Sequence, residues 1–192
     1  ANVFRAFAFF RALFDEEAAK HPQMKADHAY VDATALWFVT KPWKFDVLVT
    51  ENMFGDILSD LAAGIVGGMG MAPSGDVGTE HGIFQPSHGT APDIAGKGIA
   101  NPCAQILSAA LMLRHSFGLN DIAENIERAV KQAVMDGNRT GDISFGKPSI
   151  GTKEMAAAVI AKQIGFPAPD EAYTLGLFHN AGMPLLMSRF PN

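Results

Sequence analysis

Apolar residues recur with a helical period in several stretches of the chain. The stretches are residues 3–20, 33–40, 55–65, 104–117, the segment between Asn120 and Gly137, and a last helix that starts at Thr152 and stops at Gly165. Proline after His21 should end the first helix, because the residue before a proline is disfavoured in the helical region. Asn120 is a predicted N-cap, and Gly137 lies just past the end of its helix.

Two other stretches have the pattern of strands. Residues 45–50 form a compact apolar run, typical of a strand buried on both faces, and residues 29–31 suggest a shorter strand. Alternation of strands and helices predicts an α/β architecture with a largely parallel sheet. The glycine-rich residues 64–82 and the proline-rich residues 84–102 are predicted as loops or irregular strand.

Composition narrows the function classes. The 192 residues carry a net charge of -5, which gives no electrostatic surface for nucleic acid or for an anionic membrane. No apolar run approaches the roughly 20 residues that span a bilayer, and no secretory signal is visible. A single cysteine, Cys103, excludes an intrachain disulfide and favours the cytoplasm. Cys103 is either a nucleophile or a small buried residue, and burial is the commoner state of a free cysteine.

Two carboxylates form the sharpest local feature. Residues 52–60 read N-M-F-G-D-I-L-S-D, which puts Asp56 and Asp60 four apart and therefore on one face of a helix. Like charges at this spacing repel, whereas a hard divalent cation such as Mg²⁺ or Mn²⁺ would make the pair favourable. The alternative is that both are solvated acids near the start of a helix, where the dipole favours negative charge.

Residues 88–102 read H-G-T-A-P-D-I-A-G-K-G-I-A-N-P. Small residues let a ligand approach the backbone, and loop N–H groups can bind phosphate oxygens. Asp93 could accept both hydroxyls of an adenosine ribose, and it would repel a 2′-phosphate. A glycine- and proline-rich surface loop is the alternative. No G-x-G-x-x-G fingerprint is present.

Taken together, these two segments closely resemble the β-decarboxylating dehydrogenases, the family of isopropylmalate, isocitrate, homoisocitrate and tartrate/D-malate dehydrogenases. The resemblance runs from Ala1 to about Gly165. It implies an isocitrate/isopropylmalate dehydrogenase-like α/β fold, with a parallel or mixed sheet flanked by helices. The chain is expected to be incomplete relative to the family.

The resemblance also implies a site. Asp56 and Asp60 correspond to metal ligands of one subunit, and Asp32 to a third metal ligand, also a catalytic carboxylate, that reaches over from the partner of a homodimer. Mg²⁺ or Mn²⁺ would bind the substrate's hydroxyl and α-carboxylate there and promote decarboxylation after hydride transfer. The predicted cofactor-binding residues are His88, Gly89, Thr90, Ala91, Asp93, Ile94 and Asn101. Relatives that use NADP carry Lys-Tyr in place of Asp93-Ile94, so NAD is favoured.

Two departures from the family pattern stand out. Gln85 occupies the position of a glutamate in F-E-P-x-H-G, which removes a charge near the nicotinamide and bears on cofactor affinity or substrate choice. The family's catalytic lysine would immediately precede Ala1, and its tyrosine and substrate-binding arginines lie further upstream. The general base is therefore expected outside these residues, and the chain alone is expected to be inactive.

The family organisation predicts three parts. Residues 1–66 should belong to the smaller, dimer-forming domain with the metal aspartates, and residues 67–165 to the larger cofactor domain. Residues 166–192 form a tail of unknown role. An isolated copy should expose apolar surface that promotes aggregation or assembly.

The favoured function is NAD- and metal-dependent oxidative decarboxylation of a malate-type 2-hydroxy acid, with isopropylmalate as the first choice. Isocitrate or tartrate/D-malate are alternative substrates. A non-catalytic subunit or assembly module of the same family is the alternative from a different class.

Overall fold

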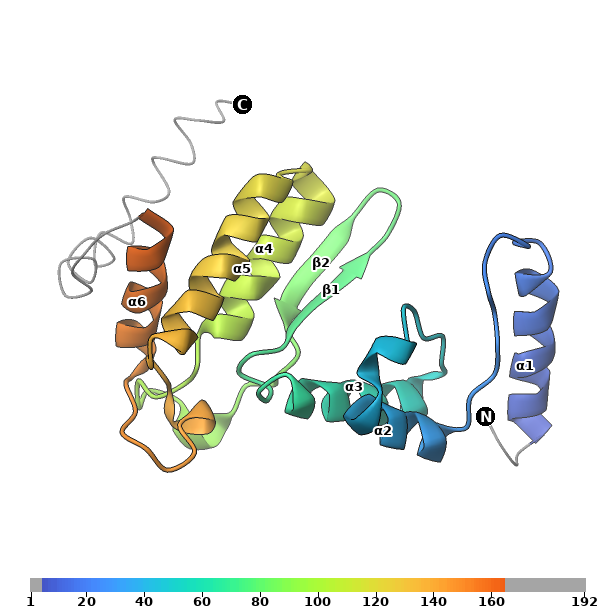
Figure 1. Cartoon of the computed structure of the whole chain (residues 1–192), viewed down its shortest axis with the longest axis horizontal. Helices are drawn as coiled ribbons and strands as arrows, with labels where there is room; N and C mark the ends of the chain where they lie inside the picture. Colours follow the sequence, from blue (N-terminus) through green and yellow to red (C-terminus); the bar gives the residue numbers. More distant parts are fainter. Residues whose placement is uncertain (1–4, 165–192) are drawn as a thin grey trace. The chain divides into compact units, whose positions relative to one another are not determined.

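The computed structural model describes residues 5–164. Predictions for residues 1–4, for the helix stop at Gly165 and for the tail at 166–192 lie outside the described residues. The chain separates into two compact units, Ala1–Ile65 and Val66–Asn192. Figure 1 shows the elements of each unit. The roles predicted for the two parts of the chain stay predictions.

The first unit contains helices α1 (Arg5–Ala18), α2 (Val31–Thr40) and α3 (Asn52–Ile65), with the short 3₁₀ helix η1 (Pro42–Lys44). Helices α2 and α3 pack against each other. Phe7 of α1 and Phe54 of α3 place their ring centroids 5.1 Å apart. All three helices confirm predicted ones. Helices α2 and α3 each begin earlier than predicted. In place of the expected strand at 29–31, residues 29 and 30 are irregular and Val31 begins α2.

The predicted buried strand at residues 45–50 is wrong. This segment has no regular structure, and Val47 and Val49 are 83% and 62% exposed. Phe45 alone packs inward, with its ring centroid 5.4 Å from that of Phe38. A central strand requires hydrogen-bonded neighbours, and among the described residues the only sheet is a two-stranded one elsewhere in the chain.

The second unit is a row of elements that starts with a β-hairpin and ends with a helix. Strands β1 (Pro73–Val77) and β2 (Gly82–Pro86) pack on helix α4 (Cys103–Phe117). Helix α5 (Asn120–Met135) packs on α4, and α6 (Thr152–Ile164) packs on α5 (Figure 1). The 3₁₀ turns η2 (Pro92–Ile94) and η3 (Gly141–Ile143) lie in the connecting segments.

The three helices confirm the predicted ones, with one correction at a cap. Asn120 is the first residue of α5 rather than its N-cap, and Leu119 occupies the cap without a side-chain hydrogen bond. Gly137 ends the same helix as predicted. It adopts φ +95°, a conformation that favours glycine, and donates its N–H to the carbonyl of Val134.

The hairpin shows regular strands within the stretches 64–82 and 84–102, which were predicted as loops or irregular strand. Strands β1 and β2 pair antiparallel, with Gly75 opposite Phe84, so the sheet of the described residues is not the parallel one expected. A Cβ at Gly75 would lie 2.9 Å from the Phe84 ring, and one at Gly82 would lie 2.7 Å from it. Glycine is therefore needed here for close packing in a strand, and not because the chain turns.

Small side chains dominate the core of the second unit. Fully or almost fully buried alanines lie on all three helices: Ala104, Ala110, Ala123, Ala129, Ala133, Ala157, Ala158 and Ala161. Met155 of α6 has no exposed surface and is the largest fully buried side chain among the described residues. It packs in one cluster with Cys103 of α4 and Val130 of α5. Small residues let the helix backbones approach closely, and the few large side chains then fill the remaining space.

Candidate functional site

Two of the three predicted metal carboxylates lie on α3, in the first unit. Asp56 and Asp60 are both exposed, and their spacing places them on one face of the helix, one turn apart. The amide of Asn52 donates a hydrogen bond to Asp56 Oδ2 at 3.1 Å, which orients that carboxylate. Oxygen donors on a solvent-facing helix surface fit a hard divalent cation that also binds an oxygen-rich substrate.

Glu51 holds the start of this helix, a role the sequence analysis missed. Its Oε2 accepts the N–H of Met53 and its Oε1 accepts the N–H of Phe54, both at 2.8 Å. A carboxylate that satisfies two N-terminal N–H groups also interacts favourably with the helix dipole. An acidic residue directly before the apolar run was the signal available in the sequence. The cap fixes the helix turn that leads into Asp56.

Asp32 lies in the first turn of α2 and is also exposed. Its Oδ1 accepts the N–H of Ala33 at 2.9 Å. Among the described residues, no three His, Cys, Asp or Glu side chains come close enough to hold a metal ion. The structure thus brings Asp56 and Asp60 together on one helix, and it does not add Asp32 to them within one chain.

The predicted nucleotide residues lie in one exposed segment of the second unit, between β2 and α4. Ala91 adopts a left-handed conformation with φ 45°, and the turn η2 follows it directly, presenting Asp93 to solvent. A Cβ added at Gly89 would meet nothing within 4 Å, so the backbone there is open to a ligand. An exposed carboxylate beside open backbone fits the ribose and phosphates of a dinucleotide.

Part of the loop's hydrogen-bonding capacity is already used. The N–H groups of Ile94, Ala95 and Lys97 all bond to carbonyls within the loop. His88 Nδ1 lies 2.8 Å from the carbonyl of Gly89. Since a carbonyl can only accept, Nδ1 is the donor in this contact. Phosphate binding would therefore use other N–H groups of the loop than these three.

Asn101 differs from the other predicted nucleotide residues because it is buried. It is 9% exposed, and its amide is held on both sides. Nδ2 donates to Asp142 Oδ2 at 3.0 Å, and Oδ1 accepts the N–H of Cys103, the first residue of α4, at 3.0 Å. Gly70 lies so close that a Cβ on it would come within 2.7 Å of the Asn101 Cβ.

Cys103 is a buried core residue, and the nucleophile hypothesis for it is wrong. A helix N-terminus normally lowers the pKa of a thiol. Here burial, with a smaller contribution from the negative charge of Asp142, raises the pKa of Cys103 from 9.0 to about 12. The side chain has no exposed surface.

We expect folded Cys103 to react with iodoacetamide at pH 8 at least about 100-fold more slowly than the urea-unfolded chain, because thiolate is the reactive form. The rate for the unfolded chain should rise steeply up to pH 9.0, its ordinary pKa, whereas the folded rate should stay low. Mass spectrometry measures the labelling, and the single cysteine makes it unambiguous. Rapid stoichiometric labelling of the folded chain would contradict the burial described.

Gln85 lies in β2 opposite Ser74, and its side chain is exposed. The hairpin leads directly into the predicted nucleotide segment through Ser87, whose N–H donates to the carbonyl of Ala72 at 3.1 Å. Gln85 is thus placed on a rigid strand three residues before His88. No described contact assigns it a partner in the site.

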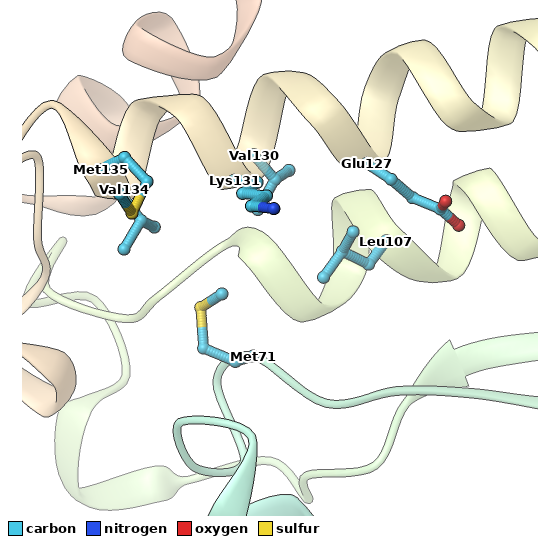
Figure 2. Close-up of a pocket in the computed structure, with 7 residues that line it drawn as sticks. All are labelled: Met71, Leu107, Glu127, Val130, Lys131, Val134 and Met135. Carbon is cyan, nitrogen blue, oxygen red and sulfur yellow. The ribbon is translucent and has the colours of Figure 1, made fainter. Parts of the chain in front are cut away.

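A hollow of about 280 Å³ lies elsewhere in the second unit, between Met71, α4 and α5 (Figure 2). Its lining is mostly apolar: Met71, Leu107, Val130, Val134 and Met135, with Glu127 and Lys131. Arg114 binds Glu127 through two hydrogen bonds of 2.6 and 2.9 Å and holds its pKa below the usual value. No predicted site residue lines this hollow, so it has no part in the site.

Within the described part of the chain, no helix combines the length and the apolar character required to cross a membrane.

Comparison with known proteins identifies relatives over most of the chain. A 3-isopropylmalate dehydrogenase of Pseudomonas savastanoi pv. phaseolicola is 50% identical over 163 residues, 84% of this chain and 45% of that protein. One from Oceanobacillus iheyensis is 51% identical over 162 residues, 83% of this chain and 44% of the relative. The chain thus spans a little under half the length of these relatives.

Solved structures of related dehydrogenases are also similar to this chain. An isocitrate dehydrogenase from Methylococcus capsulatus superposes with a TM-score of 0.75 at 44% identity, covering 81% of this chain and 46% of that chain. A β-decarboxylating dehydrogenase from Thermococcus kodakarensis gives 0.72 at 38% identity, covering 85% and 47%. The fold is therefore isocitrate/isopropylmalate dehydrogenase-like, as predicted. The sequence profile of the isocitrate/isopropylmalate dehydrogenases matches residues 1–159, and the chain belongs to this family of oxidoreductases.

Proposed function

We propose that this chain provides the metal carboxylates and the adenosine-binding loop of an NAD-dependent enzyme that oxidatively decarboxylates a malate-type 2-hydroxy acid, with 3-isopropylmalate as the favoured substrate. The observation that carries the proposal is the geometry of α3. Asp56 and Asp60 share one exposed face, on a helix whose start Glu51 holds through two hydrogen bonds.

The residues of the chain would form two sites, one for the metal ion and one for the cofactor. Asp56 and Asp60, joined by Asp32 from the partner of a homodimer, would hold Mg²⁺ or Mn²⁺, which supplies a positive charge for the oxygens of the substrate. Asp93 would accept the ribose hydroxyls of NAD, which takes up the hydride from the hydroxyl-bearing carbon. His88, Gly89, Thr90, Ala91 and Ile94 would line the adenosine end.

Exposed apolar side chains on the first unit support the homodimer. Trp43 is 80% exposed, and Ile57, on the metal-bearing helix, is 56% exposed. Single exposed apolar residues are common, but a group of them marks an interaction surface. A second copy of the chain would cover this surface and bring its Asp32 to the site. A lone cysteine fits the reducing cytoplasm, where we place the reaction.

The test is a turnover assay on protein expressed from the whole coding region that contains residues 1–192. Formation of NADH or NADPH is followed with Mn²⁺, either NAD or NADP, and each of 3-isopropylmalate, isocitrate, tartrate and D-malate. We expect turnover with 3-isopropylmalate and NAD, with NADP at least about tenfold poorer because Asp93 repels a 2′-phosphate. Turnover with isocitrate alone would replace the substrate, and no turnover with any acid would favour the non-catalytic assembly role.

A further inference from the structure

The side-chain amide of Asn101 is fixed in one orientation by two partners. Its oxygen accepts the N–H of Cys103, and one hydrogen of its nitrogen is donated to Asp142. An amide nitrogen carries two hydrogens, so one N–H is left that Asp142 does not take. The opposite orientation of the amide would place its NH₂ against the N–H of Cys103 and its oxygen against the carboxylate of Asp142. The N–H of Cys103 and the carboxylate of Asp142 together fix the amide orientation, and Asp142 is the side-chain partner that holds its NH₂ group.

Asp142 is itself held in place, 41 residues further along the chain. Its Oδ1 accepts the hydroxyl of Thr140 at 2.5 Å, and Thr140 has no exposed surface. Further along the chain, the first residue of α6 also hydrogen-bonds to the end of the nucleotide loop. There the N–H of Thr152 donates to the carbonyl of Gly98 at 2.8 Å, and its hydroxyl donates to the carbonyl of Ala100.

Resting on the proposed function, we propose that Asp142 is a positioning residue for NAD binding: it holds Asn101 so that the second N–H of the amide is directed to an acceptor atom of the nucleotide. Asp142 contacts no ligand itself in this scheme. Thr140 fixes the carboxylate, the carboxylate fixes the amide, and the amide fixes both the start of α4 and the end of the loop. A carboxylate suits this role because it accepts from Thr140 and Asn101 at once and presents no competing donor.

The experiment compares Asp142→Asn and Asp142→Ala with the unaltered protein, again expressed from the whole coding region. The asparagine keeps the size of the side chain but turns an NH₂ group toward either Asn101 or Thr140. Each variant should weaken NAD binding, measured by calorimetry, about tenfold, the effect of one lost charge-assisted hydrogen bond. Mn²⁺ affinity should be unchanged, because the proposed metal carboxylates lie on α3.

Hydrogen exchange of the Cys103 backbone amide reports on the contact without any cofactor. That amide should exchange about tenfold faster in Asp142→Asn, because a loosened Asn101 no longer holds it. The double variant Asn101→Asp/Asp142→Asn reverses the polarity of the hydrogen bond between these two residues and should restore slow exchange. Asp121→Asn is the matched control, since Asp121 lies at the opposite end of α5 from the segment that contains Asp142.

Four outcomes separate the possibilities. Faster Cys103 exchange together with weaker NAD binding supports the proposal. Unchanged exchange in both Asp142 variants overturns it, whatever the affinity. Faster exchange with unchanged NAD affinity overturns the positioning role and leaves a purely structural contact. If the unaltered protein binds no NAD while exchange still responds to Asp142, the proposed function itself has failed, and the nucleotide role of Asp142 fails with it.

Discussion

Asp60→Asn is expected to weaken Mn²⁺ binding by at least about 100-fold. Mutating a residue that only hydrogen-bonds to a metal ligand typically costs about 10–100-fold in metal affinity, and loss of a ligand itself should cost at least the upper value. A carboxamide keeps the size of the side chain and one oxygen donor, but it removes the negative charge that a hard cation requires. Asp56→Asn should have a similar effect, and it would also disturb the hydrogen bond from Asn52.

The negative charges of Asp56 and Asp60 favour metal binding but slightly destabilise the metal-free helix. Without metal, like charges one turn apart on an exposed helix repel by about 0.2–0.5 kcal/mol. Neutralising Asp60 should therefore leave the thermal stability of the metal-free protein unchanged or slightly raised. The same substitution should remove the stabilisation that added Mn²⁺ gives to the unaltered protein. Loss of metal affinity is thus distinguishable from loss of fold.

Electron paramagnetic resonance of free Mn²⁺ measures the affinity, on protein expressed from the whole coding region. Glu16→Gln is the matched control, because Glu16 is an exposed carboxylate on another helix of the same unit. It should bind Mn²⁺ like the unaltered protein. Equal affinity in Asp60→Asn and Glu16→Gln would contradict a metal role for α3.

Local patterns in the sequence predicted the helices, because each helix depends on residues a few positions apart. Gly137 shows this for a helix end: the glycine and the carbonyl it binds, that of Val134, are three residues apart. The same pattern reading placed Asp56 and Asp60 on one face of a helix, which the structure confirms. It also placed the predicted nucleotide residues in one segment.

The strands were predicted poorly because they depend on partners distant in sequence. Residues 45–50 have the composition of a buried strand, yet Val47 is 83% exposed, since no described strand pairs with them. Gly75 and Gly82 belong to the stretch predicted as loop or irregular strand, but they lie in a hairpin where the Phe84 ring leaves no room for a Cβ. Whether a residue favours a strand depends largely on the neighbours against which its side chain packs.

The surroundings of Asn101 could not be predicted for the same reason. Its partner Asp142 is 41 residues away, in a short turn between two helices that carries no signal beyond its glycine and aspartate. The resemblance predicted Asn101 as a ligand contact. The structure adds that its amide oxygen already accepts one hydrogen bond and that one of its two N–H groups already donates one. Sites built on loops therefore need the structure to show which of their polar groups are still available.

Met155→Ala is expected to destabilise the second unit by about 2–5 kcal/mol, as do other truncations of fully buried large side chains. Met155 has no exposed surface, and its cluster contains Cys103, Ala129, Val130 and Ala133. Because the neighbours are mostly small and the helices are already closely packed, the site can collapse little after truncation. The cavity term should therefore add to the lost transfer free energy.

Thermal unfolding followed by circular dichroism measures the effect, with a drop in Tm of roughly 5–15 °C expected for a chain of this size. Met135→Ala is the matched control: it makes the same change at a helix position that is 73% exposed, and it should shift stability by less than about 0.5 kcal/mol. Met155→Leu preserves most of the volume and should cost less than about 1.5 kcal/mol. Equal stability of Met155→Ala and Met135→Ala would mean that α6 does not pack on α4 and α5 through Met155. The same loss would loosen Cys103 and the start of α4, so the stability of this core and the position of Asn101 are expected to change together.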